Sequence, residues 1–217
     1  MLKANNLQKR YHDLQVLKGV NLQVQAGEIV SVVGASGAGK STLLHILGTL
    51  DRADSGDLEL QGQSLANFSD EQMAQFRNQH IGFVFQFHNL LPEFTALENV
   101  CLPAWIAKKD FAETNKKALN LLDRLGISDR KDHKPAQLSG GEQQRFAVAR
   151  ALINSPKIVF ADEPSGNLDS KNAEELHQLF FDLRAELKQT FVIVTHNPTL
   201  ATMADRMIEM VDGRIKI

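Results

Sequence analysis

The stretch VSVVGASGAGKST, residues 30–42, holds residues whose types and spacing suit phosphate chemistry. An apolar run gives way to small residues, and then to one lysine and two hydroxyls. Glycine lets the backbone approach a ligand closely and adopt dihedral angles that side chains forbid, and the N-terminus of a following helix attracts an anion. Backbone N–H groups of such a loop can cradle a triphosphate. The expected cradle consists of Gly34, Ala35, Ser36, Gly37, Ala38 and Gly39.

The three residues after these complete the expected site. Lys40 would bring positive charge to the β- and γ-phosphates, Ser41 would place its hydroxyl on Mg²⁺, and Thr42 would contact an earlier phosphate. The alternative is a glycine-rich turn that merely caps a helix. Because a chance match to this pattern is on the order of one in a hundred for a chain of this length, we expect the phosphate site.

In the stretch KIVFADEP, residues 157–164, two acidic residues follow four apolar ones. Asp162 stands at the carboxyl end of an expected buried strand, where it can hold Mg²⁺ through water. Glu163 comes one residue later, so strand alternation would turn it to the other face, within reach of the water that attacks a γ-phosphate. Adjacent acids can also be surface residues that cap a helix. Beside a phosphate loop, we favour the catalytic interpretation.

The sequence LSGGEQQR, residues 138–145, predicts a second anion site. Ser139 and Glu142 have the spacing of a capping box, while Gly140 and Gly141 would expose backbone N–H groups at the start of a helix. The chain supplies no obvious ligand for them. A bare helix cap, which needs no ligand, explains the same residues, so the pattern alone leaves both interpretations open.

Alternating strands and helices are expected to position these groups. Helical patterns run over residues 40–50, 69–79 and 172–187 and from residue 198, and capping boxes are predicted at Ser69 with Gln72 and at Thr95 with Glu98. Between about residues 86 and 137 the pattern is helical without a strand signal. The alternation predicts a mostly parallel sheet covered on both faces, with ligands at the carboxyl ends of its strands. Strands are expected at 2–7, 16–25, 28–33, 57–65 (a hairpin), 81–85, 158–161, 190–196, 206–211 and 214–217.

Bulk composition excludes several classes of protein. The 217 residues carry a formal net charge of −2 with dispersed Lys and Arg, which argues against sequence-independent nucleic-acid binding. No run approaches the roughly 18 apolar residues of a membrane span, and the N-terminus lacks the apolar core of a signal peptide. Cys101, the single cysteine, excludes an internal disulfide and is expected to be buried. We therefore expect the chain in the cytosol.

The stretch LSGGEQQR resembles the signature of ATP-binding-cassette (ABC) ATPases. The other motifs of that family follow in matching order, so the resemblance covers essentially the whole chain. These motifs are the phosphate loop, Gln86, VFADEP, NLD and His196. The resemblance implies one α/β domain of the P-loop NTPase type, with a mostly parallel sheet flanked by helices. Its core, which carries an antiparallel β subdomain, would comprise residues 1–85 and 156–217. A helical subdomain with the signature would span about residues 86–155. The implied activity is ATP hydrolysis coupled to transport.

The resemblance also implies roles for individual residues. Two subunits would pack head to tail, so that the signature of one closes on the γ-phosphate held by the other. Tyr11 would stack on adenine, although the glycine that often follows this aromatic is missing and simple packing is the alternative. Gln86 would contact Mg²⁺ and the attacking water, and His196 would bond the γ-phosphate instead of serving as an ordinary core or surface histidine. Asp169 would lie at the dimer interface. The signature residues acting across that interface would be Ser139, Gly140, Gly141 and Gln143.

Three further stretches, FQFHNLLPEFTALENVCLP, DEPSGNLDSKN and VTHNPTLA, are most similar to the lipoprotein-releasing members of the family. Macrolide export and cell division are the alternative roles. The resemblance implies separate membrane permeases and a peripheral position on the cytoplasmic face of the inner membrane. A DNA-repair cassette would need coiled-coil or metal-binding inserts, and a small-molecule kinase would lack the signature. The expected permease contact, which could equally be core, is Phe87, Leu90, Leu91, Pro92 and Phe94; Trp105 is expected in the core.

Overall fold

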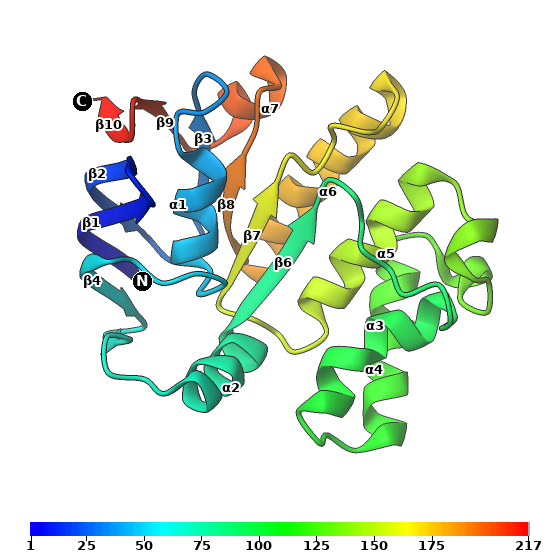
Figure 1. Cartoon of the computed structure of the whole chain (residues 1–217). Helices are drawn as coiled ribbons and strands as arrows, with labels where there is room; N and C mark the ends of the chain where they lie inside the picture. Colours follow the sequence, from blue (N-terminus) through cyan, green and yellow to red (C-terminus); the bar gives the residue numbers. More distant parts are fainter. Residues whose placement is uncertain (217) are drawn as a thin grey trace.

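A computed structural model describes residues 1–216 as two sheets and the helices around them (Figure 1). The larger sheet has six strands in the order β10-β9-β3-β8-β7-β6. Neighbouring strands from β9 to β6 run parallel, and only β10 is antiparallel to its neighbour. The expected mostly parallel sheet is therefore confirmed. Its strands are β3 (Ile29–Val33), β6 (Ile81–Phe85), β7 (Ile158–Asp162), β8 (Thr190–Val194), β9 (Arg206–Val211) and β10 (Arg214–Lys216).

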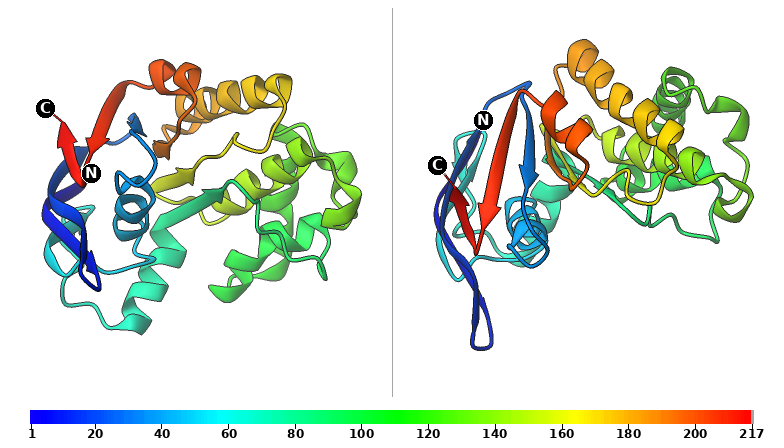
Figure 2. Two further views of the ribbon diagram at one scale, coloured as in Figure 1. Left: turned by 45° about the horizontal axis from the view of Figure 1, so that its top comes forward. Right: turned by 90° about the horizontal axis from the view of Figure 1, so that it is seen from above.

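The smaller sheet is antiparallel, with strands in the order β2-β1-β4-β5. Its strands are β1 (Leu2–Tyr11), β2 (Leu14–Val24), β4 (Ser55–Leu60) and β5 (Gln63–Ser64). One face of this sheet packs on α1 (Lys40–Leu47), because Leu2, Leu7 and Leu17 share a buried cluster with the leucines of that helix. The N-terminus and strand β10 lie beside this sheet in Figure 2.

The chain between β6 and β7 consists of helices joined by turns and loops, without a strand, as its periodicity predicts. Figure 2 shows these helices at the opposite end of the molecule from the small sheet. Both predicted capping boxes, at Ser69 with Gln72 and at Thr95 with Glu98, are present. The helices outside α1 are α2 (Asp70–His80), α3 (Ala96–Ile106), α4 (Phe111–Arg124), η1 (Ser128–Arg130), η2 (Pro135–Gln137), α5 (Gly140–Leu152), α6 (Ser170–Leu187) and α7 (Pro198–Met203).

The core lies on both faces of the six-stranded sheet, and β7 shows why. Ile158 and Phe160 pack towards α1 and the small sheet, whereas Val159 and Ala161 pack towards α5 and α6. Successive residues of a strand point to opposite faces, so a strand covered on both sides must be apolar throughout. All four residues are at most 1% exposed. The apolar run of β7 is therefore interior, and it ends at the partly buried Asp162.

Strand register brings the functional ends of the strands to one edge. Asp162 at the end of β7 is level with Phe85 on β6 and Val194 on β8. Val194 is in turn level with Val32 on β3, just before the phosphate loop. The residues that follow each strand therefore emerge side by side.

Some sequence expectations need correction in detail. Helix α1 ends at Leu47, so Leu50 lies outside its apolar face and is 44% exposed. Trp105 is only partly buried and stacks on Phe111 with ring centroids 5.1 Å apart. Cys101 is fully buried, as expected. Among the helices of residues 1–216, none is both long enough and apolar enough to cross a bilayer.

Candidate active site

The phosphate loop needs glycine for two separate reasons. Gly37 and Gly39 have φ of 78° and 98°, values that residues with side chains rarely adopt. A Cβ on Gly34 would lie 2.3 Å from the backbone oxygen of Met210, which is sterically impossible without a shift of the backbone. The loop thus follows a path that only these glycines permit.

Helix α1 begins directly after this loop, at Lys40. Its N-cap, Gly39, offers no side-chain acceptor, and its first turn has no acidic residue. The N–H groups at a helix start have no partner within the helix, and they carry the positive end of the helix dipole. This helix start therefore suits an external anion such as a phosphate.

The Lys40 amine lies over the same loop. It donates to the carbonyl oxygens of Gly34 at 2.8 Å and Ala35 at 3.0 Å. A lysine held in this way needs only a change of side-chain torsion to reach a phosphate seated on the loop. The expected position of Lys40 in the phosphate site agrees with this contact.

Residues from different segments surround a cavity of about 260 Å³ at the carboxyl edge of the sheet. The Ser41 hydroxyl donates to Asp162 across 3.3 Å. Burial raises the pKa of Asp162, and repulsion from Glu163 adds to this effect, while the Ser41 hydrogen bond and nearby positive charge oppose it. A hydroxyl and a partly desolvated carboxylate are oxygen donors of the kind that Mg²⁺ prefers, so these residues fit that ion. The cavity is lined by Ser41, Phe85, Gln86, Phe87, Asn89, Asp162 and Glu163.

The side chain of Glu163 does not follow the expected strand alternation. Strand β7 ends at Asp162, and Glu163 has φ of 45°. This left-handed residue breaks the period of two, so Asp162 and Glu163 line the same cavity instead of opposite faces of the sheet. The two carboxylates therefore face one cavity, an arrangement that a regular strand would not give.

His196 and Glu163 are in direct contact. The Nδ1 atom of His196 lies 2.8 Å from Oε2 of Glu163, and the His196 backbone N–H donates to the same oxygen at 3.1 Å. The side chain of His196 is 72% exposed, whereas that of Glu163 is 18% exposed. The histidine expected at the γ-phosphate thus holds the acid expected at the attacking water.

Gln86 also has a partner that the sequence did not indicate. Its side-chain amide donates to Oδ1 of Asn167 at 2.9 Å, and Asn167 donates back to the Gln86 carbonyl at 3.2 Å. A Cβ on Gly166 would lie 2.8 Å from the Gln86 amide nitrogen. Asn167 lies within the SGNLD stretch, but no property of its type or spacing assigned it this role.

Tyr11 is anchored by a small charged network. Its hydroxyl donates to Oδ2 of Asp51 at 2.6 Å, and the Lys9 amine donates to Oδ1 of Asp51 at 2.8 Å. The Asp51 hydrogen bond raises the pKa of Tyr11, and burial adds to it. Burial disfavours ionisation of Asp51, but its bonds from Lys9, Tyr11 and the Arg52 backbone outweigh this and lower its pKa. The Tyr11 residue is 43% exposed, so it is held by its hydroxyl more than by packing.

The signature forms the predicted capping box at the start of α5. The Ser139 hydroxyl accepts from the Glu142 N–H at 3.3 Å, while Glu142 accepts from the Ser139 N–H at 2.8 Å. Gly141 is required there because its Cβ would lie 2.5 Å from the Asn172 side chain. Gly140 is exposed, and the Gln143 side chain donates to the Leu138 carbonyl at 3.2 Å.

The signature is remote from the phosphate loop of its own chain. Helix α5 belongs to the helical end of the molecule, whereas α1 lies beside the small sheet (Figure 1). Within residues 1–216, the cavity next to Ser139 and the cavity next to Ser41 have no lining residue in common. Asp169, expected at a dimer interface, caps α6 by accepting from the Asn172 N–H at 2.9 Å. One chain thus carries two separate parts of the expected site.

Comparison with known proteins agrees with this geometry. Residues 17–166 match the ABC transporter family. The chain is 62% identical over 215 residues to the lipoprotein-releasing system ATP-binding protein LolD of Cytophaga hutchinsonii, with 99% of this chain and 98% of that protein covered. The identity to the LolD protein of Bacteroides thetaiotaomicron is 57% over 216 residues, with 100% and 99% covered.

Solved structures show the same fold. The dimeric structure of MJ0796, a bacterial ABC transporter cassette, has a TM-score of 0.92 and 41% identity, with 100% of this chain and 97% of that chain covered. A dimeric post-hydrolysis state of the same cassette, bound to ADP and Pi, has a TM-score of 0.90 with the same identity and coverage. The chain therefore belongs to the ABC transporter family, as an ATPase whose hydrolysis of ATP is coupled to transport.

Proposed function

We propose that the chain is the ATP-hydrolysing subunit of a system that releases lipoproteins from the inner membrane. The names of the relatives supply the cargo class, since LolD proteins at 62% and 57% identity are called lipoprotein-releasing. The observation that carries the chemistry is the single cavity that Ser41, Gln86, Asp162 and Glu163 share next to the phosphate loop.

In this proposal each residue acts on bound ATP. The loop N–H groups and Lys40 hold the β- and γ-phosphates, and Tyr11 stacks on adenine. Glu163 orients or deprotonates the attacking water, and His196 bonds the γ-phosphate while holding Glu163 across 2.8 Å. These groups place positive charge and hydrogen-bond donors where negative charge develops during phosphoryl transfer.

Ser41, Asp162 and Gln86 would hold Mg²⁺. When bound there, Mg²⁺ would neutralise charge on the phosphate oxygens. The Ser41–Asp162 contact of 3.3 Å supports this assignment because it brings two oxygen donors together beside the loop.

We further propose that the signature acts on a second copy of the chain. The N-terminus of α5 has the exposed glycine and the capping box of an anion site, yet it is remote from its own phosphate loop. A head-to-tail pair would place Ser139, Gly140, Gly141 and Gln143 on the partner's nucleotide, with Asp169 near the interface. Because the related cassette is dimeric in its solved structure, the proposal has a precedent of the same fold.

Glu163→Gln tests the catalytic assignment. Glutamine keeps the size of the side chain but cannot take a proton, so ATP binding should persist while phosphate release nearly stops. The ATP-bound dimer should then accumulate, which light scattering with ATP and Mg²⁺ would detect. Glu71→Gln, on the exposed first turn of α2, is the matched control. Undiminished hydrolysis by Glu163→Gln would refute the assignment.

A permease is proposed to dock in a groove of about 500 Å³ between α2, β6 and α3. Leu50, Phe83, Pro103 and Ile106 give it an apolar lining, and Ile106 is 71% exposed. Phe85 lines both this groove and the cavity that contains Glu163, so a docked segment would adjoin the catalytic edge.

The groove differs from the contact expected from sequence. Of that apolar stretch, Phe87 is 72% and Leu91 is 44% exposed, and Pro92 is also exposed, whereas Leu90 and Phe94 are partly buried. Its exposed members are therefore available to a partner. We expect Ile106→Asp to abolish co-purification of permeases from native membranes and to leave basal ATP hydrolysis intact, with Leu119→Asp as the control on α4.

The same purification tests the cargo class. Permeases with a large periplasmic domain would support lipoprotein release by a peripheral subunit on the cytoplasmic face of the membrane. Recovery of a cell-division partner instead would overturn that role, while the ATPase assignment would remain.

A further inference from the structure

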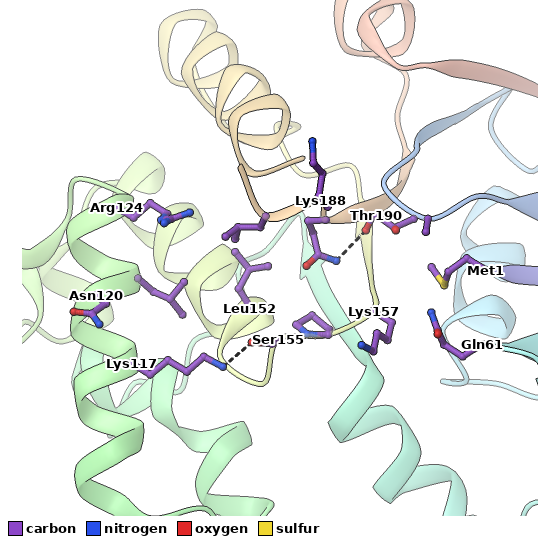
Figure 3. Close-up of a pocket in the computed structure, with 15 residues that line it drawn as sticks. Met1, Gln61, Lys117, Asn120, Arg124, Leu152, Ser155, Lys157, Lys188 and Thr190 are labelled. Atoms are coloured by element: carbon purple, nitrogen blue, oxygen red, sulfur yellow. Dashed lines mark hydrogen bonds between the residues drawn. The ribbon is translucent and has the colours of Figure 1, made fainter. Parts of the chain in front are cut away.

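A second cavity has a volume of about 550 Å³ (Figure 3). Within residues 1–216, it shares no lining residue with the cavity of the nucleotide site. One wall contains Ser155, Pro156 and Lys157, just before β7 begins, and Thr190, where β8 begins. The active site is at the carboxyl ends of these parallel strands, so this cavity is at their amino ends. Residues of α4 form the facing wall.

Among the described residues, every charged side chain that lines this cavity is cationic. Its lining includes Lys117, Arg124, Lys157 and Lys188, and within residues 1–216 it includes no Asp or Glu. Arg124 pairs with Glu186 at 2.7 Å, but none of the three lysines forms an ion pair in the described part of the chain. The chain as a whole is slightly acidic, with a formal net charge of −2, so this concentration of cations is local.

The two lysines best placed for a ligand come from opposite walls. Figure 3 shows Lys117 reaching in from α4 and Lys157 from the strand side, whereas the Lys188 amine extends away from the cavity. Lys117 donates to the neutral hydroxyl of Ser155 at 2.7 Å. Burial and the neighbouring Lys109 lower the pKa of Lys117. An anion between the walls would relieve this unfavourable environment.

The remaining surface is largely apolar. Leu121 of α4, Leu152 of α5, Pro156 and Leu187 all belong to the lining. Leu187 is 42% exposed. The volume falls within the range of about 300 to 1,000 Å³ that is typical of small-molecule sites. Cations beside an apolar wall suit a ligand that combines a negative group with an apolar body.

We propose that this cavity binds an organic phosphate, with its phosphate between Lys117 and Lys157 and its apolar part against Leu121 and Leu152. The ligand would join α4 of the helical part to the strands of the large sheet. It would be independent of ATP, since the phosphate loop is at the other edge. A soluble phosphate ester and the headgroup region of an anionic phospholipid both have this chemistry.

The test uses the full chain with saturating ADP and Mg²⁺, so that the phosphate loop is occupied. 1-Naphthyl phosphate, whose binding is followed by calorimetry, is the amphipathic probe, and inorganic phosphate is the comparison without an apolar body. We expect naphthyl phosphate to bind at one site per chain and inorganic phosphate to bind more weakly. Lys117→Met with Lys157→Met should weaken the binding of naphthyl phosphate by about tenfold or more, because two charge-assisted bonds are lost.

A second pair of substitutions controls for charge. Lys3→Met with Lys18→Met makes the same charge change on exposed positions of the small sheet and should leave affinity unchanged. Flotation with phosphatidylglycerol vesicles, against phosphatidylcholine vesicles, separates the two sources. Recruitment that requires Lys117 and Lys157 assigns the lipid, and naphthyl phosphate binding without recruitment assigns a soluble ester.

Both double variants should keep the melting temperature and basal ATPase activity of the natural protein, which shows that they fold. The proposal is overturned if no probe binds at millimolar concentration. It is equally overturned if the Lys117 and Lys157 variant binds as tightly as the natural protein.

Discussion

Removal of the Asp51 carboxylate should raise the KM for ATP while kcat stays unchanged. Asp51 holds the hydroxyl of Tyr11 at 2.6 Å, and the Tyr11 residue is 43% exposed. The Lys9 amine lies 5.2 Å from the centroid of the ring, and Asp51 also holds this amine, at 2.8 Å. If Tyr11 stacks on adenine, Asp51→Ala leaves the ring present but free to rotate. ATP must then immobilise it on binding, and the reacting phosphates are unaffected.

The expected increase in KM follows from the free energy that is needed to immobilise the Tyr11 ring. Immobilising one side chain costs about 0.5 to 1.5 kcal/mol, which corresponds to an increase in KM of about two- to tenfold. Tyr11→Ala loses the stacking itself, worth about 1 to 3 kcal/mol, and should be more severe. Asp51→Ala also leaves the Lys9 amine without its 2.8 Å partner. We expect a loss of stability of about 1 to 2 kcal/mol, with allowance for the partial exposure of Asp51.

The assay is a double-mutant cycle on the steady-state KM for ATP. Tyr11→Phe keeps the ring and removes only the hydroxyl, so it should match Asp51→Ala. The double variant should be no worse than either single one, because both remove the same bond. Asp57→Ala, on the exposed edge of β4, is the control. Additive effects of the two substitutions, or an unchanged KM in a folded Asp51→Ala protein, would refute the anchoring role.

The pH dependence of the unfolding free energy provides an independent test of the Asp51 contacts. The lowered pKa of Asp51 means that its contribution to stability is complete above about pH 4, the ordinary carboxylate pKa, and is lost as the pH falls through the lower folded value. The difference in unfolding free energy between the natural protein and Asp51→Ala should therefore shrink on acidification. A difference that grew instead would contradict the assigned charge state.

Three other substitutions or treatments test the packing around the site. Gly34→Ala should reduce ATP affinity measured by calorimetry by more than about tenfold, because its Cβ would lie 2.3 Å from the Met210 backbone oxygen. Asn99→Leu should cost about 3 kcal/mol or more in urea unfolding, since it removes the bonds to the Leu91 N–H at 2.7 Å and carbonyl at 3.0 Å and leaves buried groups unpaired. Cys101 is fully buried and its pKa is raised to about 11 by burial, so it should not react with a thiol reagent near pH 8.5 until guanidinium unfolds the chain.

The parts of the site that sequence could predict are those that depend on a few neighbouring residues. The phosphate loop, the signature cap and the strand before Asp162 each occupy one short stretch, and the structure has all three in the expected elements. Capping boxes are equally local, because a hydroxyl at the N-cap meets a glutamate or glutamine three residues later. Such contacts do not depend on how distant segments fold together.

Other contacts could not be predicted because they depend on tertiary register. Asp51 reaches Tyr11 across 40 positions of sequence, and Asn167 reaches Gln86 across 81. Neither partner belongs to a pattern that would single it out before the segments are placed together. Glu163 was predicted as a site residue, but the direction of its side chain was wrong, since its φ of 45° ends the strand alternation on which that direction depended.

The tertiary contacts around Phe85 and Gln86 explain how a docked partner could act on ATP. Phe85 lines the groove and the catalytic cavity, and its carbonyl accepts from the buried side chain of Gln144, on the signature helix, at 3.3 Å. Gln86 is bonded to Asn167, two residues before Asp169. A shift of β6 towards or away from the groove must therefore alter the bond to the signature helix, the bond to the loop before α6, or both. Because the amide of Gln144 is fully buried and costly to leave unpaired, the signature helix should move together with β6.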